Sequence, residues 1–407
     1  MMKKVLNYIN IFSLLWLVVA WLFNVTAPRW FAYGGIELFT VSWIAECIVE
    51  RRWQGWKWDA RTLYFFLPLL LFSLAFVYMP FDTNTHFNRL IEHRLGLFTT
   101  ALFGLFGVNG RYTLRGMFRV LTVLAVGACV YVVCRIGVIE FFAAPNKTEL
   151  FELARNQYVN AHMQFNFMLC VALIGIWYCV FRDTRSTFWW EKVLYGLAAG
   201  IIMITLAISE GRSGFIAGLA IVGVLSVVET MRFRRWLGWT AISVVVVVGG
   251  LALMHHSRMS TGELTGEPRL QLWKSAIELI EERPILGYGM SRAQDEFAQV
   301  STKYTDDVYN DFWHDQIAVL DTHNQYLQAW LEFGVFGFVL VLMIYIVPMF
   351  IDTRHRLLSV MIFGLCMFQS LFDMFITGSF CIPYTILALM MLAVEWKQPV
   401  NPNAVCK

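Results

Sequence analysis

The sequence predicts an all-α polytopic membrane protein with about twelve transmembrane helices and one large extracytoplasmic loop that contains short helices. Composition is the first reason, because 58% of the 407 residues are hydrophobic and only 15% are charged. A water-soluble domain of this size could not hide so much apolar surface, so lipid must be the solvent. The second reason is a succession of apolar runs of about twenty residues, the length that crosses a bilayer. The third is the polar stretch 255–325, which interrupts them.

The apolar runs define the transmembrane helices in order. We expect spans at residues 5–25, 30–48, 63–79, 95–108, 118–137, 163–181, 193–208, 214–229, 237–254, 327–351, 356–376 and 379–396. The fourth is short and glycine-containing, and a polar hinge at 209–213 separates the seventh from the eighth. The chain therefore divides into helices one to nine in 1–254, the extracytoplasmic loop 255–325, and three helices with a tail in 326–407.

Basic residues orient these spans. Lys and Arg gather at the N-terminus and in alternate loops, at 51–61, 111–119, 182–192, 232–235 and 354–356, whereas the other short loops hold few. This is the positive-inside pattern, which predicts that both termini are cytoplasmic and that the polar loop lies outside. Lys3 and Lys4 precede an apolar run too long for a signal peptide, so we expect an uncleaved first span.

Several function classes are disfavoured by what the sequence lacks. The net charge of +3 is too small to suggest nucleic acid as a partner. None of the eight cysteines lies in the polar loop, so neither a disulfide framework nor a cysteine metal site is indicated. There is no dinucleotide or Walker-type phosphate loop. We therefore expect a substrate that is already activated, or an ion gradient, and no cofactor.

The polar loop itself contains helix signals. Pro268 suits a first helical position, and a helix is expected over 268–282 with Leu270, Trp273, Ile277 and Ile280 on one face. Such an amphipathic helix would lie on the membrane surface or on the helical bundle.

Two further helix starts have capping-box spacing. Ser291 with Gln294 opens a second helix that has Ala293, Phe297 and Val300 on one face. Thr322 with Gln325 opens a third, which places His323 and Asn324 in its first turn.

A helix N-terminus favours a bound phosphate and disfavours a protonated imidazole. His323 is therefore a candidate general base, because a neutral imidazole beside an anionic ligand can accept a proton. The alternative is a polar capping residue at the membrane interface.

Three arginines could face the same compartment: Arg212, Arg269 and Arg292. The planar guanidinium binds phosphate through two hydrogen bonds and stays charged in a half-apolar site. Arg212 lies between two apolar spans, where a charge is costly and usually functional. Alternatively it extends outward or pairs with Glu210. Arg292 follows a capping serine, and solvation is the alternative there.

Other polar residues complete the set of candidates. His162 and Asn166 share a helix face and could line a substrate groove or make interhelical hydrogen bonds. Glu332 could position the helix or an acceptor substrate. Asp373 and Arg135 could pair or contact a sugar or phosphate. Asp306, Asp307, Asp311, His314, Asp315 and Asp321 form an acidic stretch. It could bind a divalent cation, but the ligand set is incomplete and a solvated face is the simpler interpretation.

Three sequence motifs in this order resemble the O-antigen ligase/polymerase superfamily of bacterial envelope enzymes. They are Glu-Gly-Arg-Ser-Gly, then Pro-Arg-Leu-Gln-Leu-Trp with Arg-Pro-Ile-Leu-Gly-Tyr-Gly, then Thr-His-Asn-Gln-Tyr-Leu-Gln-Ala-Trp-Leu-Glu-Phe-Gly, and they cover roughly residues 205–340. The N-terminal half carries no matching motif.

The resemblance implies a GT-C glycosyltransferase in the bacterial inner membrane, with its active loop in the periplasm. The donor would be a glycan on undecaprenyl pyrophosphate, and lipid A–core or another glycan would be the acceptor. Arg212 and Arg269 would hold the pyrophosphate, and His323 would deprotonate or orient the acceptor hydroxyl. Beside these three, Asn324, Arg292, His162, Asn166 and Glu332 are candidates for substrate contacts from their positions in the sequence. The chemistry would invert the anomeric carbon without a metal.

Alternatives remain open at this point. A ligase is favoured over a polymerase because a single large outer loop dominates, and the 143–162 segment is modest. A polymerase would use a second lipid-linked repeat unit as acceptor, and a protein acceptor is also possible. A transporter or flippase for lipid-linked sugars is less favoured, because its binding groups would lie at mid-membrane rather than at one face.

Overall fold

The computed structural model of the chain describes residues 2–23, 29–55, 58–78, 87–107, 114–159, 162–183, 188–209, 211–236, 239–240, 268–304, 321–351 and 355–377. Within these ranges every regular element is a helix, as the predicted fold class requires. The predicted span 379–396, nearly all of the span 237–254, and the acidic stretch 306–315 lie outside the described residues.

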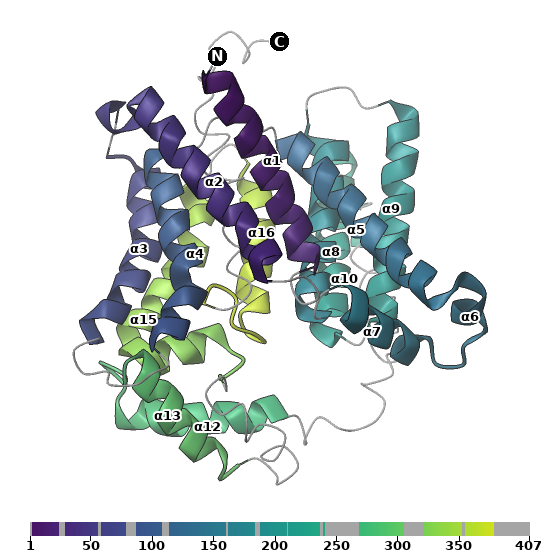
Figure 1. Ribbon diagram of the computed structural model, residues 1–407. Helices are drawn as coiled ribbons and strands as arrows, with labels where there is room; N and C mark the ends of the chain where they lie inside the picture. Colours follow the sequence, from purple (N-terminus) through teal and green to yellow (C-terminus); the bar gives the residue numbers. More distant parts are fainter. Residues whose placement is uncertain are drawn as a thin grey trace. The chain divides into compact units, whose positions relative to one another are not determined.

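The helices follow the predicted apolar runs closely (Figure 1). They are α1 (Met2–Phe23), α2 (Arg29–Glu50), the short η1 (Arg52–Gly55), α3 (Ala60–Tyr78), α4 (Phe87–Phe106), α5 (Leu114–Ile136), α6 (Val138–Ala143), α7 (Lys147–Tyr158), α8 (His162–Trp177) with its π-helical continuation η3 (Tyr178–Arg182), α9 (Trp189–Ile208), α10 (Arg212–Phe233), α12 (Pro268–Glu282), α13 (Met290–Ser301), α15 (Gln325–Ile351) and α16 (Arg356–Gln369).

Five helices in the described part of the chain are long and apolar enough to cross a membrane. They are Leu114–Ile136, His162–Arg182, Trp189–Ile208, Ser213–Phe233 and Gln325–Ile351. Shorter apolar helices at Lys4–Ala20, Thr62–Val77, Arg94–Phe106 and Arg356–Gln369 fall on four more predicted spans. The chain is therefore a multi-pass membrane protein, and the count of twelve spans stays a prediction. The predicted eleventh span, 356–376, is too long, because its helix ends at Gln369.

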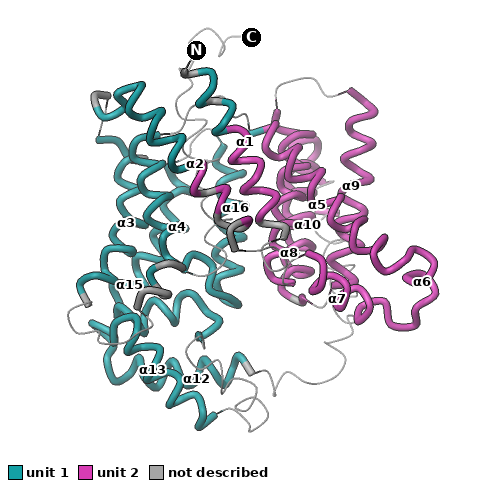
Figure 2. The backbone as a smooth tube through the Cα atoms, in the orientation of Figure 1, with its two compact units in different colours: residues 1–10, 40–114, 266–407 teal, residues 11–39, 115–265 magenta. Residues whose placement is uncertain are grey.

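The chain forms two compact units (Figure 2). Unit 1 contains Met1–Asn10, Thr40–Leu114 and Gly266–Lys407, and unit 2 contains Ile11–Phe39 and Arg115–Thr265. In unit 1, α3 packs on α4 and α15, and α15 also packs on α16. In unit 2, α8 packs against α9 and α10, and its side chains from Met163 to Trp177 are all buried.

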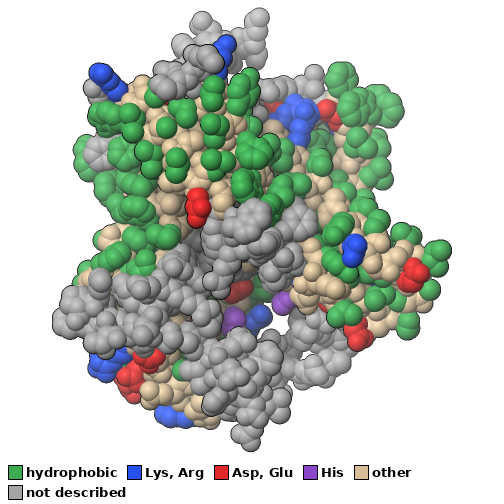
Figure 3. All heavy atoms as spheres, viewed as in Figure 1, with side chains coloured by type: hydrophobic (Ala, Val, Ile, Leu, Met, Phe, Trp, Pro, Cys, Tyr) green, Lys and Arg blue, Asp and Glu red, His purple; other side chains and the backbone are tan. Residues whose placement is uncertain are grey.

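Side-chain types on the surface match a membrane-embedded part and a polar layer. Figure 3 shows hydrophobic side chains over the visible faces of α3 and α9, whereas charged side chains gather over α12 and α13. The α12–α13 pair packs on the N-terminal half of α15 in unit 1. It forms the polar layer that the sequence predicts in the 255–325 loop.

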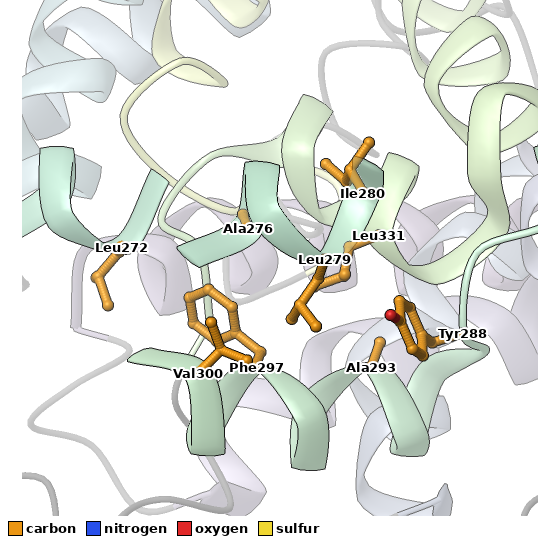
Figure 4. Close-up of a cluster of buried hydrophobic side chains, with 9 residues drawn as sticks. All are labelled: Leu272, Ala276, Leu279, Ile280, Tyr288, Ala293, Phe297, Val300 and Leu331. Carbon is orange, nitrogen blue, oxygen red and sulfur yellow. The ribbon is translucent and has the colours of Figure 1, made fainter. Parts of the chain in front are cut away.

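An apolar cluster holds this layer together (Figure 4). It consists of Leu272, Ala276, Leu279 and Ile280 from α12, Ala293, Phe297 and Val300 from α13, with Tyr288 and Leu331. Burial of each large apolar side chain in it contributes about 1.5–3 kcal/mol. The predicted helix 268–282 and the predicted buried face of α13 are confirmed.

The predicted apolar face of α12 is wrong. Leu270 and Ile277 are 43% and 46% exposed, and the buried face is instead centred on Ala276. Apolar residues lie on both sides of this helix, so periodicity alone did not choose between them. The small side chain of Ala276 lets α13 approach closely, and that close packing decides the face.

Candidate active site

A break in α15 joins two of the sequence motifs. Gly334 has φ 65° and ψ −160°, which interrupts the helix. There the Val335 N–H donates to the Pro284 carbonyl at 3.0 Å, and the N–H groups of Tyr288 and Gly289 donate to the carbonyls of Leu331 and Glu332 at 2.9 and 2.8 Å. The Arg-Pro-Ile-Leu-Gly-Tyr-Gly segment is thereby hydrogen-bonded to the end of the Trp-Leu-Glu-Phe-Gly segment.

Two glycines make that docking possible. A Cβ atom on Gly334 would lie 1.9 Å from the Ile285 carbonyl oxygen, and one on Gly287 would lie 2.6 Å from the Gly334 nitrogen. Both residues have positive φ, which other residues rarely adopt. The two motifs are thus parts of one rigid structure, which explains their glycines physically.

The turn before α15 carries His323. The helix begins at Gln325, and Asn324 Oδ1 accepts hydrogen bonds from the N–H groups of Tyr326 and Leu327 at 3.0 and 3.1 Å. Asn324 is therefore the N-cap, and the prediction that Thr322 caps the helix is wrong. An amide oxygen two or three residues from the N–H groups reaches them directly, which makes Asn324 the better cap.

The predicted capping box of α13 is also wrong. That helix begins at Met290 after Gly289, which provides no side-chain cap, so Ser291 lies inside the first turn.

His323 itself lies just outside the helix in a strained backbone conformation. Its φ is 45°, in the left-handed region that costs a non-glycine residue about 1–2 kcal/mol. The Asp321 carboxylate accepts a 2.8 Å hydrogen bond from the His323 N–H and stabilises the turn. Strain of this kind persists only where neighbouring contacts hold it, and it is concentrated at functional sites.

The segment after α16 closes over the start of α15. The Gln325 N–H donates to the Ser370 carbonyl at 2.9 Å, and Gln325 Oε1 accepts from the N–H groups of Ile376 and Thr377 at 2.9 and 3.2 Å. Because the helix stops at Gln369, these residues form a turn that delivers Asp373 to the side of His323. The prediction that Asp373 lies within a span is therefore wrong.

Two carboxylates face one nitrogen of His323. Its Nδ1 lies 3.4 Å from Asp321 Oδ1 and 3.8 Å from Asp373 Oδ1. The side chains of His323 and Asp321 are 32% and 31% exposed, so a substrate could reach them. In the described part of the chain, no hydrogen bond involves Nε2, which leaves that nitrogen for a substrate.

Opposing effects set the protonation state of the His323 imidazole. Burial lowers the pKa of His323, but the charges of Asp321 and Asp373 outweigh it, so the pKa lies above the usual 6.5. Burial also raises the pKa of Asp321, against the opposing charge of His323. The sequence predicted a neutral imidazole because it considered only the helix terminus, and it did not take the charges of Asp321 and Asp373 into account. A helix terminus contributes about 0.3–1 kcal/mol, whereas unit charges 4 Å apart interact by about 4 kcal/mol near a protein surface.

Arg269 also affects the pKa of His323. It is half-buried on α12, and its positive charge lowers the pKa of His323, which opposes the carboxylates. One turn later on α12, Trp273 Nε1 donates to the Thr322 carbonyl at 3.1 Å, so the helix is fixed to the His323 turn. In the structure Arg269 is therefore near enough to His323 for its charge to act on the imidazole.

A buried polar chain supports the turn from behind. The Thr322 N–H donates to Gln328 Oε1 at 3.2 Å, and Gln328 Nε2 donates to Glu332 Oε1 at 2.8 Å. Arg94 Nη2 lies 2.6 and 2.7 Å from the two Glu332 oxygens. Arg94 and Glu332 are 2% and 1% exposed, so Glu332 supports the turn from inside the protein.

Sequence reasoning missed Arg94 and Gln328. The available signal was an arginine at the edge of the predicted fourth span, because a charge at that depth needs a partner. Its partner could not be identified from the sequence, since 238 residues separate Arg94 from Glu332.

The remaining candidates have other local surroundings. Arg292 is exposed on α13 and pairs with Glu296 at 3.3 Å, in keeping with the solvated alternative. Arg212, His162 and Asn166 belong to unit 2, with Arg212 as the first residue of α10 and His162 half-buried at the start of α8. Arg135, offered as a partner for Asp373, stacks on the Tyr158 ring at 4.2 Å in that same unit.

Asn166 packs against the Glu-Gly-Arg-Ser-Gly motif. Its Nδ2 donates to Ser209 Oγ at 3.0 Å, which makes the interhelical hydrogen bond that was one of its two expected roles. Cβ atoms on Gly211 and Gly214 would lie 2.3 and 2.4 Å from Asn166 atoms, so these glycines give it room. Ser209 in turn donates to the buried Glu152 at 2.9 Å, which fixes the turn before Arg212.

Comparisons with known proteins agree with the motif order. Residues 197–342 match the model of the family described as O-antigen ligase. A Haemophilus influenzae protein named only as uncharacterized is 26% identical over 183 residues, which cover 40% of this chain and 44% of that protein. A Rickettsia conorii protein named "Putative polysaccharide ligase" is 28% identical over 152 residues, 35% of each chain. The matched regions span less than half the length of either relative. Over residues 197–342 the chain is therefore similar to the O-antigen ligase family.

Proposed function

We propose that this protein is an inverting GT-C glycosyltransferase that transfers a glycan from undecaprenyl pyrophosphate to lipid A–core. The observation that carries the proposal is His323, held on a strained turn with Asp321 and Asp373 at one ring nitrogen and Arg269 close by. This arrangement combines a base with a phosphate-binding cation in the domain that matches the O-antigen ligase family.

The reaction follows from the charges. The acceptor hydroxyl oxygen forms a bond to the anomeric carbon, and the bond from that carbon to the pyrophosphate oxygen breaks. His323 Nε2 takes the hydroxyl proton, and the two carboxylates stabilise the imidazolium that forms. The guanidinium of Arg269 compensates the charge that develops on the departing pyrophosphate. Attack on the side opposite the leaving group inverts the anomeric configuration.

The proposal needs neither a metal nor a nucleotide, because the donor already stores the energy. The polyprenyl tail of the donor requires apolar grooves between helices, which a multi-pass membrane protein supplies. We further propose that the enzyme lies in the bacterial inner membrane with both termini in the cytoplasm and α12–α13 in the periplasm.

The test is reconstitution of the purified protein with an undecaprenyl-pyrophosphate-linked glycan and a chelator, with and without lipid A–core. Glycan attached to lipid A–core is the expected product. Lengthened lipid-linked glycan in the absence of core would make the protein a polymerase instead. No product in either reaction would contradict the proposed transferase.

Single variants then test the site. His323→Ala and Arg269→Ala are expected to reduce transfer to background, because the base and a phosphate-binding charge are lost. Arg269→Lys should also be severely impaired, because an ammonium group cannot bind phosphate in the same bidentate way. Arg292→Ala, on the exposed face of α13, is the control and should keep its activity within about twofold of the parent if that arginine is merely solvated. Near-normal transfer by His323→Ala would remove the proposed base.

A further inference from the structure

The exposed apolar surface of α15 begins abruptly at the Gly334 break. From Gln325 to Gly334 no side chain is exposed, because the α12–α13 layer and the turn after α16 cover this half. Beyond the break a stripe of exposed apolar residues follows at helical spacing. It consists of Val335, Phe336, Val339, Met343, Ile346 and Phe350. Such a stripe on a membrane-crossing helix is the surface that faces lipid hydrocarbon.

The length of this segment agrees with that assignment. Val335–Ile351 rises by about 26 Å at 1.5 Å per residue, which is close to the roughly 30 Å thickness of the hydrocarbon layer. The break at Gly334 therefore coincides with the edge of the hydrocarbon on the side of α12 and α13.

The loop between α12 and α13 places two large apolar side chains at this same level. Ile285 and Leu286 are 62% and 64% exposed. Their backbone touches that of Gly334, where an added Cβ would lie 1.9 Å from the Ile285 oxygen and 2.6 Å from the Leu286 nitrogen. The exposed tip of the loop thus lies beside Gly334, the residue at which the apolar stripe of α15 begins.

The loop is held rigidly in this position. The Pro284 carbonyl accepts hydrogen bonds from the Val335 N–H at 3.0 Å and from Trp330 Nε1 at 2.9 Å. The Gly287 N–H donates to the Arg283 carbonyl at 3.1 Å, which closes the turn around the tip. The exposure of Ile285 and Leu286 is therefore built into the fold, since the loop cannot fold back to bury them without breaking these bonds.

Residues suited to a membrane–water boundary flank the tip. Trp330 is half-buried with its indole N–H satisfied, and Arg283 stacks over the Tyr288 ring at 4.7 Å. An amphipathic Trp side chain favours the headgroup region, and a long arginine can reach outward from it. The half-buried Trp330 and the exposed Arg283 thus lie beside the exposed apolar tip.

From these exposed side chains and their position at Gly334 we propose that the Pro284–Gly287 loop inserts Ile285 and Leu286 into the hydrocarbon of the adjacent leaflet. The occupant of this surface is membrane lipid, because the tip adjoins the start of the lipid-facing stripe of a membrane-crossing helix. The insertion fixes the depth in the membrane of the N-terminal half of α15, Gln325–Gly334, and of the α12–α13 layer packed on it. His323 precedes that half, so it lies on the order of 14 Å from the hydrocarbon edge along the helix.

The test measures where residue 286 lies in a bilayer. Leu286→Cys carries a nitroxide in a background with Cys134→Ser, Cys381→Ser and Cys406→Ser. The protein is placed in nanodiscs of phosphatidylethanolamine and phosphatidylglycerol. Collision rates of the label with oxygen, which dissolves in hydrocarbon, and with a water-soluble nickel chelate are compared. Phe336→Cys, 60% exposed in the stripe, is the lipid reference, and Gln299→Cys, exposed on α13, is the water reference.

The proposal predicts that the oxygen-to-nickel ratio at residue 286 matches that at 336 and exceeds that at 299 several-fold. A ratio like that at 299 would overturn it, because the tip would then be in water. Low collision rates with both reagents would also overturn it, since a second copy or another protein would then cover the tip. The measurement needs no substrate, so its outcome is independent of the proposed transferase activity.

Discussion

At His323 the local sequence and the tertiary structure have opposite effects on a single proton. The helix terminus and burial both favour a neutral ring, whereas Asp321 and Asp373 favour the charged one. The carboxylates prevail and raise the pKa of His323 above 6.5. A base in this position releases its proton to water less readily but takes one from a hydroxyl more readily.

The pH dependence of transfer should therefore report this group. Because the neutral imidazole is the active form, kcat/KM is expected to fall as the pH drops through a value above 6.5. Asp373→Asn removes one of the charges that raise the pKa of His323, so its acid limb should move to lower pH, with a lower maximal rate. Asp295→Asn on α13 is the control, for which no change is expected. An acid limb that stays in place or moves upward in Asp373→Asn would contradict the assignment.

Whether a site residue could be predicted from the sequence depended on how far its interaction partner lies from it along the chain. His323 and Arg269 could be chosen from their motifs, because an arginine and a histidine in a polar loop are typical of phosphate and proton chemistry. Asp373 and Arg94 could not be assigned to the site, since their partners lie 50 and 238 residues away and nothing local encodes that pairing. Asn324 was chosen as a substrate contact, and the structure shows its amide capping α15.

At the scale of elements, α15 is two helical segments joined at Gly334. Gly334→Ala adds a Cβ that would lie 1.9 Å from the Ile285 carbonyl oxygen on a residue with φ 65°. The left-handed backbone alone costs alanine about 1–2 kcal/mol, and the clash adds to it. Thermal unfolding in detergent should show a Tm several degrees lower, together with weaker transfer. Gly364→Ala on α16, where a Cβ meets nothing within 4 Å, is the matched control and should be unchanged or slightly stabilised. An equal Tm for the two variants would mean that the docking does not stabilise the fold.

The ion pair between α4 and α15 makes a separate prediction. Glu332→Gln leaves Arg94 buried without its carboxylate, and breaking a buried pair in this way costs about 3–5 kcal/mol. The double variant Arg94→Met/Glu332→Met removes both charges and is expected to recover most of the Tm. Its kcat should stay low, because Gln328 loses the carboxylate that orients it toward Thr322. Recovery of both Tm and kcat in the double variant would show that the turn does not depend on this chain.

A helix boundary was predicted correctly where a single residue in the sequence marks it. Pro268 fixed the start of α12, and its predicted range is the observed one. The caps of α13 and α15 were misplaced because Gly289 and Ser291 lie close together at the start of α13, as do Thr322 and Asn324 before α15. Side-chain geometry then decides which of them reaches the first N–H groups.

At the scale of the whole molecule, apolar length predicted most helices but did not establish the number of spans. α1 and α2 contain Asn10, Ser42 and Glu46, which are buried and bonded to one another, with Asn10 Nδ2 2.9 Å from Glu46 Oε2. Arg52 Nη2 lies 2.9 Å from the same carboxylate. Polar groups satisfied inside a bundle lower the mean hydropathy of a helix without exposing it to lipid. A transmembrane helix can therefore carry polar groups that the packed interior satisfies.

The closure of residues 370–377 over the start of α15 has a consequence for biosynthesis. Residues 269 and 323 are translated well before residue 373, so a growing chain holds its histidine and arginine before the second carboxylate exists. The Gln325 bonds to Ser370, Ile376 and Thr377 form only after α16 has been made and the chain has turned back. The ribosome thus delivers the second carboxylate of the candidate site 50 residues after His323. A nascent chain passing through the membrane cannot present the complete set of groups before its helices have assembled.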